Sequence, residues 1–250
     1  MVHSFLLIGQ SNMAGRGFPN EVEPIDSTNI VVLRNGRWWP MYVPVNPDRK
    51  TAGINLAESF AEQYAREHGV QVGLIPCADG GTSLNQWQPG GVLFDHACAM
   101  AELADRSSTI VGVLWHQGEG DCGDALYPLY EEKLRKIVRA FRKKPFLKDV
   151  PFLVGGLGDY LRNYTAPHIS RNYVHVNEAL GAVVAGEENM GYVSAEGLGA
   201  NPDNLHFSAA ALREFGLRYY EVFKTLEKTD RVFAEKPDWD FAVRTEMEAL

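Results

Sequence analysis

An abrupt change from apolar to polar residues marks the segment Leu6-Leu7-Ile8-Gly9-Gln10-Ser11-Asn12-Met13-Ala14-Gly15-Arg16-Gly17. The apolar run Phe5–Ile8 predicts a buried strand, and Gly9 ends it. Ser11 then follows just past the carboxyl end of that strand, which is where open α/β sheets place their ligand sites. Glycine, serine and asparagine are also common in simple turns. The segment therefore predicts either a functional serine or a strand-to-loop turn.

Further apolar runs alternate with helical patterns along the chain. The predicted strands are 30–33, 37–41 after an Asn35-Gly36 turn, 72–75, 109–115, 152–154 and 191–193. The predicted helices cover 54–64, 92–105, 127–141, 170–185 and 212–226. This repeated order predicts a parallel sheet with helices on both faces. We expect one domain over 1–250, with 229–250 as a tail packed on its surface, and 157–169 as either a substrate-facing loop or an ordinary surface loop.

Composition narrows the classes of partner. The 250 residues carry a formal net charge of -8, whereas a phosphate-binding or anionic-membrane surface needs clustered Lys and Arg. We therefore expect no nucleic acid and no membrane as partner, and a neutral or weakly polar substrate. Three cysteines without a CxxC motif predict free thiols in a reducing compartment. With no room for a signal peptide before the first strand, we expect a cytoplasmic protein unless a leader was removed.

Three later loops follow predicted strands and should meet Ser11 at the same edge of the sheet. The first, Cys77–Trp87, contains Gly80-Gly81. Adjacent glycines let the backbone turn sharply and direct N–H groups into a cleft, as in an oxyanion hole. The alternative is a plain glycine turn.

The second loop, Trp115–Asp121, is dense in polar residues directly after the clearest buried strand. Gln117 could donate an amide N–H to an oxyanion, and Glu119 could orient a base. The alternative is a metal site made from His116, Glu119, Asp121 and Cys122. We disfavour it because these ligands crowd into one turn at no familiar spacing.

The third loop, Asn201–Ser208, places Asp203 three residues before His206. Such an aspartate can hold the imidazole through Nδ1 and leave Nε2 free as a general base. An Asx turn leading into a Ser208 helix cap is the structural alternative. Both can hold, because the cap uses only Ser208.

Taken in order, these loops supply Ser, Gly, Gln, Asp and His, without the G-x-S-x-G elbow of ordinary α/β-hydrolases. The sequence resembles the SGNH (GDSL-like) hydrolases, in particular the sialate O-acetylesterase and acetylxylan esterase branch, carbohydrate esterase family six. The matching motifs are GQSNMAGRG at 9–17, GGTSLNQW at 80–87, WHQGEGD at 115–121 and DNLHFS at 203–208. The resemblance implies a flavodoxin-like, three-layer α/β/α sandwich around a five-stranded parallel sheet. It also implies removal of O-acetyl groups from sugars through an acetyl-serine intermediate, with no metal and no other cofactor.

The resemblance further implies roles for individual residues. Ser11 looks like the nucleophile, His206 like the base and Asp203 like its orienter. Glu119 belongs to the same motif as Gln117, and we expect it to support the donor loop from behind, although it is also a possible partner of His206.

Oxyanion donors follow from the same resemblance. They would be the backbone N–H groups of Ser11 and of Gly81 or Gly80, together with the side chain of Gln117, which stands where other SGNH branches place an asparagine.

The expected partner is a small acetylated carbohydrate. Since no leader is visible in the sequence, we expect short imported acetylated oligosaccharides rather than polymeric xylan.

Two other functions compete with a serine carbohydrate esterase. One is a catalytically silent sugar-binding module that uses aromatics such as Trp38, Trp39 and Trp87. The other is a cysteine hydrolase that uses Cys122 or Cys77, although neither has a paired base in the sequence and free cysteine is most often inert packing.

Overall fold

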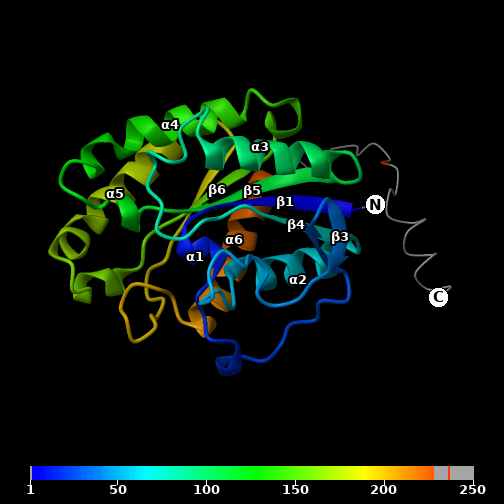
Figure 1. Ribbon diagram of the computed structural model, residues 1–250, viewed down its shortest axis with the longest axis horizontal. Helices are drawn as coiled ribbons and strands as arrows, with labels where there is room; N and C mark the ends of the chain where they lie inside the picture. Colours follow the sequence, from blue (N-terminus) through cyan, green and yellow to red (C-terminus); the bar gives the residue numbers. More distant parts are fainter. Residues whose placement is uncertain (1, 228–235, 237–250) are drawn as a thin grey trace.

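Seven strands form one sheet in the computed structural model, which describes residues 2–227 and 236 (Figure 1). The sheet order is β3-β2-β4-β1-β5-β6-β7. Its strands are β1 (Val2–Gly9), β2 (Ile30–Arg34), β3 (Arg37–Pro40), β4 (Gln71–Pro76), β5 (Thr109–His116), β6 (Phe152–Gly155) and β7 (Met190–Val193). All seven strands predicted from the sequence are present. The expected tail, 229–250, lies outside the described residues except for Lys236.

The expectation of a five-stranded parallel sheet is wrong in number. Five parallel strands, β4-β1-β5-β6-β7, do follow the flavodoxin-like order, with β1 paired to β4 and β5. The segment between β1 and α2 (Leu56–His68) adds a hairpin: β2 pairs in parallel with β4, and β3 pairs antiparallel with β2. Asn35 and Gly36 both adopt positive φ, 49° and 75°, as a tight two-residue hairpin turn requires. The resemblance missed this extension, whereas the Asn-Gly signal predicted it.

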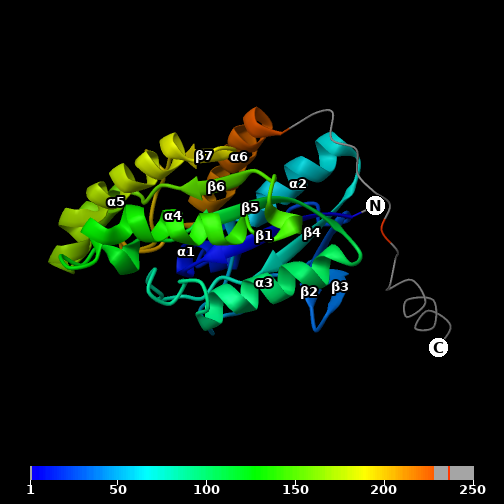
Figure 2. The ribbon, with the colours of Figure 1, turned by 90° about the horizontal axis from the view of Figure 1, so that it is seen from above.

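Helices cover both faces of the sheet and complete the predicted α/β/α sandwich (Figures 1 and 2). One face carries α3 (Val92–Asp105), α4 (Tyr130–Phe141) and α5 (Pro167–Gly186). The other face carries α2 (Leu56–His68) and α6 (Ala209–Leu226). The side chains of β1 alternate between the two: Leu6 and Ile8 join the first core, and Phe5 and Leu7 join the second. This strand is buried on both faces, which explains its uninterrupted apolar run.

Local signals set the helix ends. Asn55 caps α2 by accepting from the Ala57 N–H, and Glu58 completes the capping box by accepting from the Asn55 N–H. Ser208 caps α6 through the Ala211 N–H, as the sequence predicted. Among the described residues, no helix has both the length and the apolar character needed to span a membrane.

Parallel strands place the site loops together. The loops after β1, β4 and β5, and the segment leading into α6, meet at the carboxyl edge of the sheet, where their residues line one cavity. The chain moves from β4 on one side of β1 to β5 on the other, so the cavity lies where open α/β sheets bind ligands.

Candidate active site

Ser11 is the first residue of the short helix α1 (Ser11–Ala14), which begins directly after β1. The turn depends on Gly9, whose φ of 134° is suited to glycine. A Cβ at Gly9 would lie 2.0 Å from the carbonyl oxygen of His116 on the neighbouring strand. The backbone then continues close to that strand, since the Gln10 N–H donates to the same oxygen at 2.9 Å. This close approach fixes the position of Ser11.

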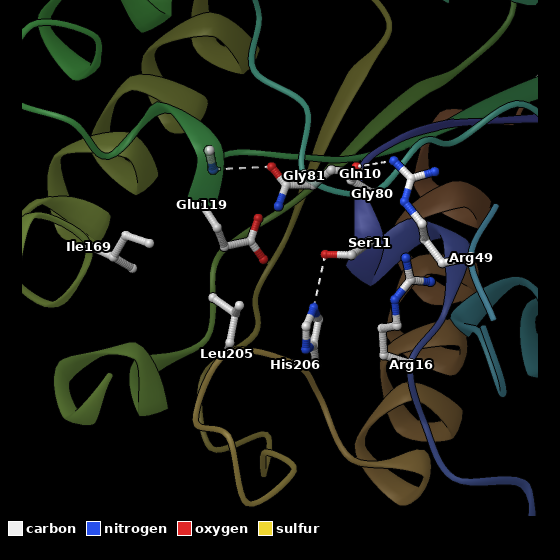
Figure 3. Close-up of a pocket in the computed structure, with 11 residues that line it drawn as sticks. Gln10, Ser11, Arg16, Arg49, Gly80, Gly81, Glu119, Ile169, Leu205 and His206 are labelled. Atoms are coloured by element: carbon white, nitrogen blue, oxygen red, sulfur yellow. Dashed lines mark hydrogen bonds between the residues drawn. The ribbon is translucent and has the colours of Figure 1, made fainter. Parts of the chain in front are cut away.

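Ser11, His206 and Asp203 form a continuous hydrogen-bonded relay. The Nε2 atom of His206 lies 3.1 Å from Ser11 Oγ (Figure 3). Its Nδ1 atom lies 2.6 Å from Asp203 Oδ2. An imidazole that carries its proton on Nδ1 donates to the carboxylate and leaves Nε2 to accept the serine proton. The structure therefore brings together the three residues that the sequence proposed as nucleophile, base and orienter.

The carboxylate of Asp203 is held in its charged form. Partial burial raises its pKa, but hydrogen bonds from the backbone and side chain of His206 and from the Leu205 N–H outweigh this effect and lower the pKa. Asp203 Oδ1 accepts from the N–H groups of Leu205 and His206 at 2.9 and 3.0 Å. The Asx turn is thus part of the relay, because it aims Oδ2 at the imidazole.

Two backbone N–H groups at the cavity, one of them that of Ser11 itself, are free to bind an oxyanion. Those of Ser11 and Gly81 make no hydrogen bond within the part of the chain that the structure describes. Gly81 adopts a φ of 75°, which favours glycine. Gly80 is different, because its N–H donates to Asp48 Oδ2 at 2.8 Å. Of the two glycines offered by the sequence, Gly81 is the one with an available donor.

Gln117 does not have the geometry expected of an oxyanion donor. Its side chain is fully buried and is not among the residues that line the cavity. The Nε2 atom is already engaged by Asp121 Oδ2 at 2.6 Å and by the Thr82 carbonyl and Gln10 Oε1, both at 3.2 Å. A nitrogen with three acceptors in the protein has no proton to offer a substrate. The loop after β5 winds into a short 3-10 helix (Glu119–Asp121), which brings Asp121 back onto Gln117.

Glu119 lines the cavity but makes no hydrogen bond to His206. Its Oε1 atom accepts from Asn12 Nδ2 at 2.5 Å, and its Oε2 atom is buried without a hydrogen-bond partner. Asn12 also binds the backbone on either side of His206, at the Leu205 carbonyl and the Phe207 N–H. Glu119 therefore acts on the histidine loop through Asn12.

The cavity measures about 390 Å³, within the usual range for small-molecule sites. The sequence missed four side chains that line it: Gln10, Arg16, Arg49 and Leu205. Gln10 and Arg16 lie inside the motif at 9–17, whereas Arg49 follows no recognisable pattern.

A buried ion pair shapes the wall beside Ser11. Arg16 binds Asp48 through both guanidinium ends, at 2.7 and 3.0 Å, and Asp48 in turn holds the Gly80 N–H. From the 157–169 segment, Ile169 lines the cavity, while Tyr160 packs edge-on against Phe207. This segment thus combines both alternatives that the sequence allowed.

The alternative metal site finds no support in the geometry. Among the described residues, no group of three or more His, Cys, Asp or Glu side chains is placed to hold a metal ion. His116 Nε2 is bound to the Gly156 carbonyl, Asp121 accepts from the Leu84 N–H, and Cys122 donates to the Gly118 carbonyl. These side chains are committed to packing the loop after β5.

We expect the protein to keep full activity after exhaustive dialysis against EDTA, because each catalytic role has an organic group to fill it. The measurement is the rate of p-nitrophenyl acetate hydrolysis before and after chelation. A loss that added Zn²⁺ restores would instead support a site at His116, Glu119 and Asp121.

The residues of the two competing functions, a cysteine hydrolase and a silent sugar-binding module, are also poorly placed. Burial raises the pKa of the Cys77 and Cys122 thiols, so neither is poised to form a thiolate nucleophile. Trp87 is fully buried, and the half-exposed Trp39 lies on β3 at the far edge of the sheet. Trp38 donates to Ser107 and packs over β4 at Gly73. None of these three tryptophans lines the cavity.

A serine–histidine–aspartate relay beside two free N–H groups, at the carboxyl edge of a flavodoxin-like sheet, is the arrangement of a serine hydrolase. The model of the family described as "carbohydrate esterase, sialic acid-specific acetylesterase" matches residues 1–225. The chain belongs to this family, and its fold and family make it a carbohydrate esterase.

Relatives agree with this assignment. A probable carbohydrate esterase from Arabidopsis thaliana is 28% identical over 247 residues, covering 88% of this chain and 89% of the relative. The X-ray structure of this Arabidopsis protein superposes with a TM-score of 0.79 at 26% identity, covering 89% of this chain and 98% of the other. NanS shares the fold at a TM-score of 0.70 and 18% identity, over 90% and 97% of the two chains. A carbohydrate acetylesterase from Xanthomonas citri does so at 0.68 and 18%, over 90% and 56%.

Proposed function

We propose that this protein removes O-acetyl groups from carbohydrates through an acetyl-serine intermediate. The observation that carries the proposal is the relay from Asp203 through His206 to Ser11, which ends in a cavity of small-molecule size. The family description, a carbohydrate esterase and sialic acid-specific acetylesterase, supports an acetylated sialic acid as substrate. The resemblance to the acetylxylan esterase branch adds acetylated xylo-oligosaccharides and related sugars as candidates.

The proposed first half-reaction transfers the acetyl group to the enzyme. Ser11 Oγ bonds to the acetyl carbonyl carbon while its proton passes to His206 Nε2, and the carbonyl π electrons move to oxygen. The Ser11 and Gly81 N–H groups stabilise that oxyanion. When it collapses, the carbon–oxygen bond to the sugar breaks, and His206 returns the proton to the departing sugar oxygen.

The second half-reaction releases acetate. A water molecule gives a proton to His206 and attacks the acetyl-serine carbonyl, which regenerates the same oxyanion. Collapse then breaks the bond to Ser11 Oγ, which recovers its proton from His206. Asp203 stabilises the imidazolium in both halves without becoming protonated.

The test is acetate release from O-acetylated sialic acids, acetylated xylo-oligosaccharides and acetylated hexoses, with p-nitrophenyl acetate as a minimal ester. We expect the specificity constant for at least one sugar ester to exceed that for the aryl ester. A protein that binds these sugars without releasing acetate from any ester would be the silent binding module instead.

A further inference from the structure

Gln10 presents an uncommitted amide nitrogen to the cavity immediately before Ser11. Its side chain is only 4% exposed, yet it lines the cavity. In Figure 3 its nitrogen is directed into the cavity on the side of Ser11 and Glu119. Its oxygen points the other way and accepts from the Gly120 N–H. No hydrogen bond among the described residues uses this nitrogen.

Hydrogen bonds to its oxygen fix the orientation of the Gln10 amide. Gln10 Oε1 accepts from Gln117 Nε2 at 3.2 Å, from the Gly118 N–H at 3.4 Å and from the Gly120 N–H at 3.2 Å. Three donors on the oxygen oppose a flip of the carboxamide, which would place its NH₂ group against other donors. The Gly120 backbone itself is held closely, since a Cβ there would lie 2.6 Å from the Thr82 carbonyl oxygen. The nitrogen is therefore preorganised toward the cavity.

We propose that Gln10, rather than Gln117, supplies the side-chain hydrogen bond to the oxyanion. This inference rests on the proposed esterase function. The developing negative charge then receives N–H groups from Ser11, Gly81 and Gln10 Nε2. Gln117 is a positioning residue that holds Gln10 Oε1 and is itself held by Asp121. Fixed donors of this kind stabilise the transition state because they need no reorientation as charge develops.

The decisive variant is Gln10→Glu, because a carboxylate keeps the acceptor for the Gly118, Gly120 and Gln117 donors while it removes the amide donor. We expect kcat to fall by roughly 10²- to 10³-fold, with a much smaller change in KM and an unchanged thermal unfolding midpoint. A second variant, Gln10→Met, lacks the donor without adding charge, and we expect a similar loss of kcat. Gln71→Glu is the matched control, because Gln71 begins β4 at the edge of the sheet away from the cavity, and this variant should keep wild-type kinetics.

The outcomes separate this inference from the proposed function. If the wild-type protein hydrolyses no acetyl ester, the proposed esterase function is wrong, and so is the role of Gln10 that rests on it. If the wild type is active and Gln10→Met keeps wild-type kcat, only the role of Gln10 is wrong. A rise in KM at constant kcat would make Gln10 a ground-state binding residue and also overturn the inference. So would a large kcat loss in Gln117→Ala beside nearly silent Gln10 variants, since the donor would then be Gln117.

Discussion

Replacing Ser11 with alanine should reduce kcat by about 10⁴-fold or more, because loss of the nucleophile removes the covalent route altogether. The fold should survive. Among the described residues, the Ser11 hydroxyl makes one hydrogen bond, to His206. The backbone bonds that shape the turn, such as Gly15 N–H to the Ser11 carbonyl, remain available. The measurements are acetate release and the thermal unfolding midpoint of Ser11→Ala and wild type.

Chemical labelling gives an independent reading of the same prediction. A serine-directed organophosphonate should modify Ser11, and mass spectrometry of the digest locates the adduct. Ser83→Ala is the matched control, because Ser83 lies in a neighbouring site loop but does not line the cavity. Labelling of another residue, or retained activity in Ser11→Ala, would overturn the serine mechanism.

The strands could be predicted because their signals are local. The Phe5–Ile8 run is apolar at every position since β1 is covered on both faces, and the Asn35-Gly36 pair marks a hairpin by its own backbone preferences. The number of strands taken from the resemblance was wrong because the resemblance implied only the five parallel strands, whereas the hairpin of β2 and β3 extends this sheet beside β4.

The site could be predicted where the residues that interact are also close together in the sequence. Asp203 and His206 are three residues apart, so one turn suffices to join them. The predicted donor role of Gln117 does not fit, because neighbours such as Gln10 and Thr82 are distant in the sequence. Its nitrogen is used by Gln10, Thr82 and Asp121, and only the folded structure shows these contacts. A motif gives the residue type, whereas the direction of an amide depends on its three-dimensional neighbours. Asp48, which removes the Gly80 N–H from the available donors, gave no sequence signal at all.

Asp203→Asn should lower kcat by about 10³- to 10⁴-fold, far more than Glu119→Gln. The carboxylate of Asp203 lies 2.6 Å from His206 Nδ1, so it both sets the tautomer and stabilises the imidazolium. An asparagine amide can present N–H to Nδ1 and so favour the wrong tautomer. Asp203 also has a lowered pKa despite partial burial, because hydrogen bonds from His206 and Leu205 outweigh that burial, and it therefore stays charged at neutral pH.

Glu119→Gln should lower kcat much less than Asp203→Asn, because Glu119 contacts the relay only indirectly. Its Oε1 atom binds Asn12, which holds the backbone at Leu205 and Phe207, and a glutamine oxygen can keep that hydrogen bond. The measurements are kcat and the acid limb of the pH–rate profile, which reports the base and should move more in Asp203→Asn. Glu132→Gln, on the exposed side of α4, is the control for loss of a carboxylate. If Glu119→Gln proves the more damaging change while Asp203→Asn is nearly silent, the relay must instead run through Ser11, His206 and Glu119.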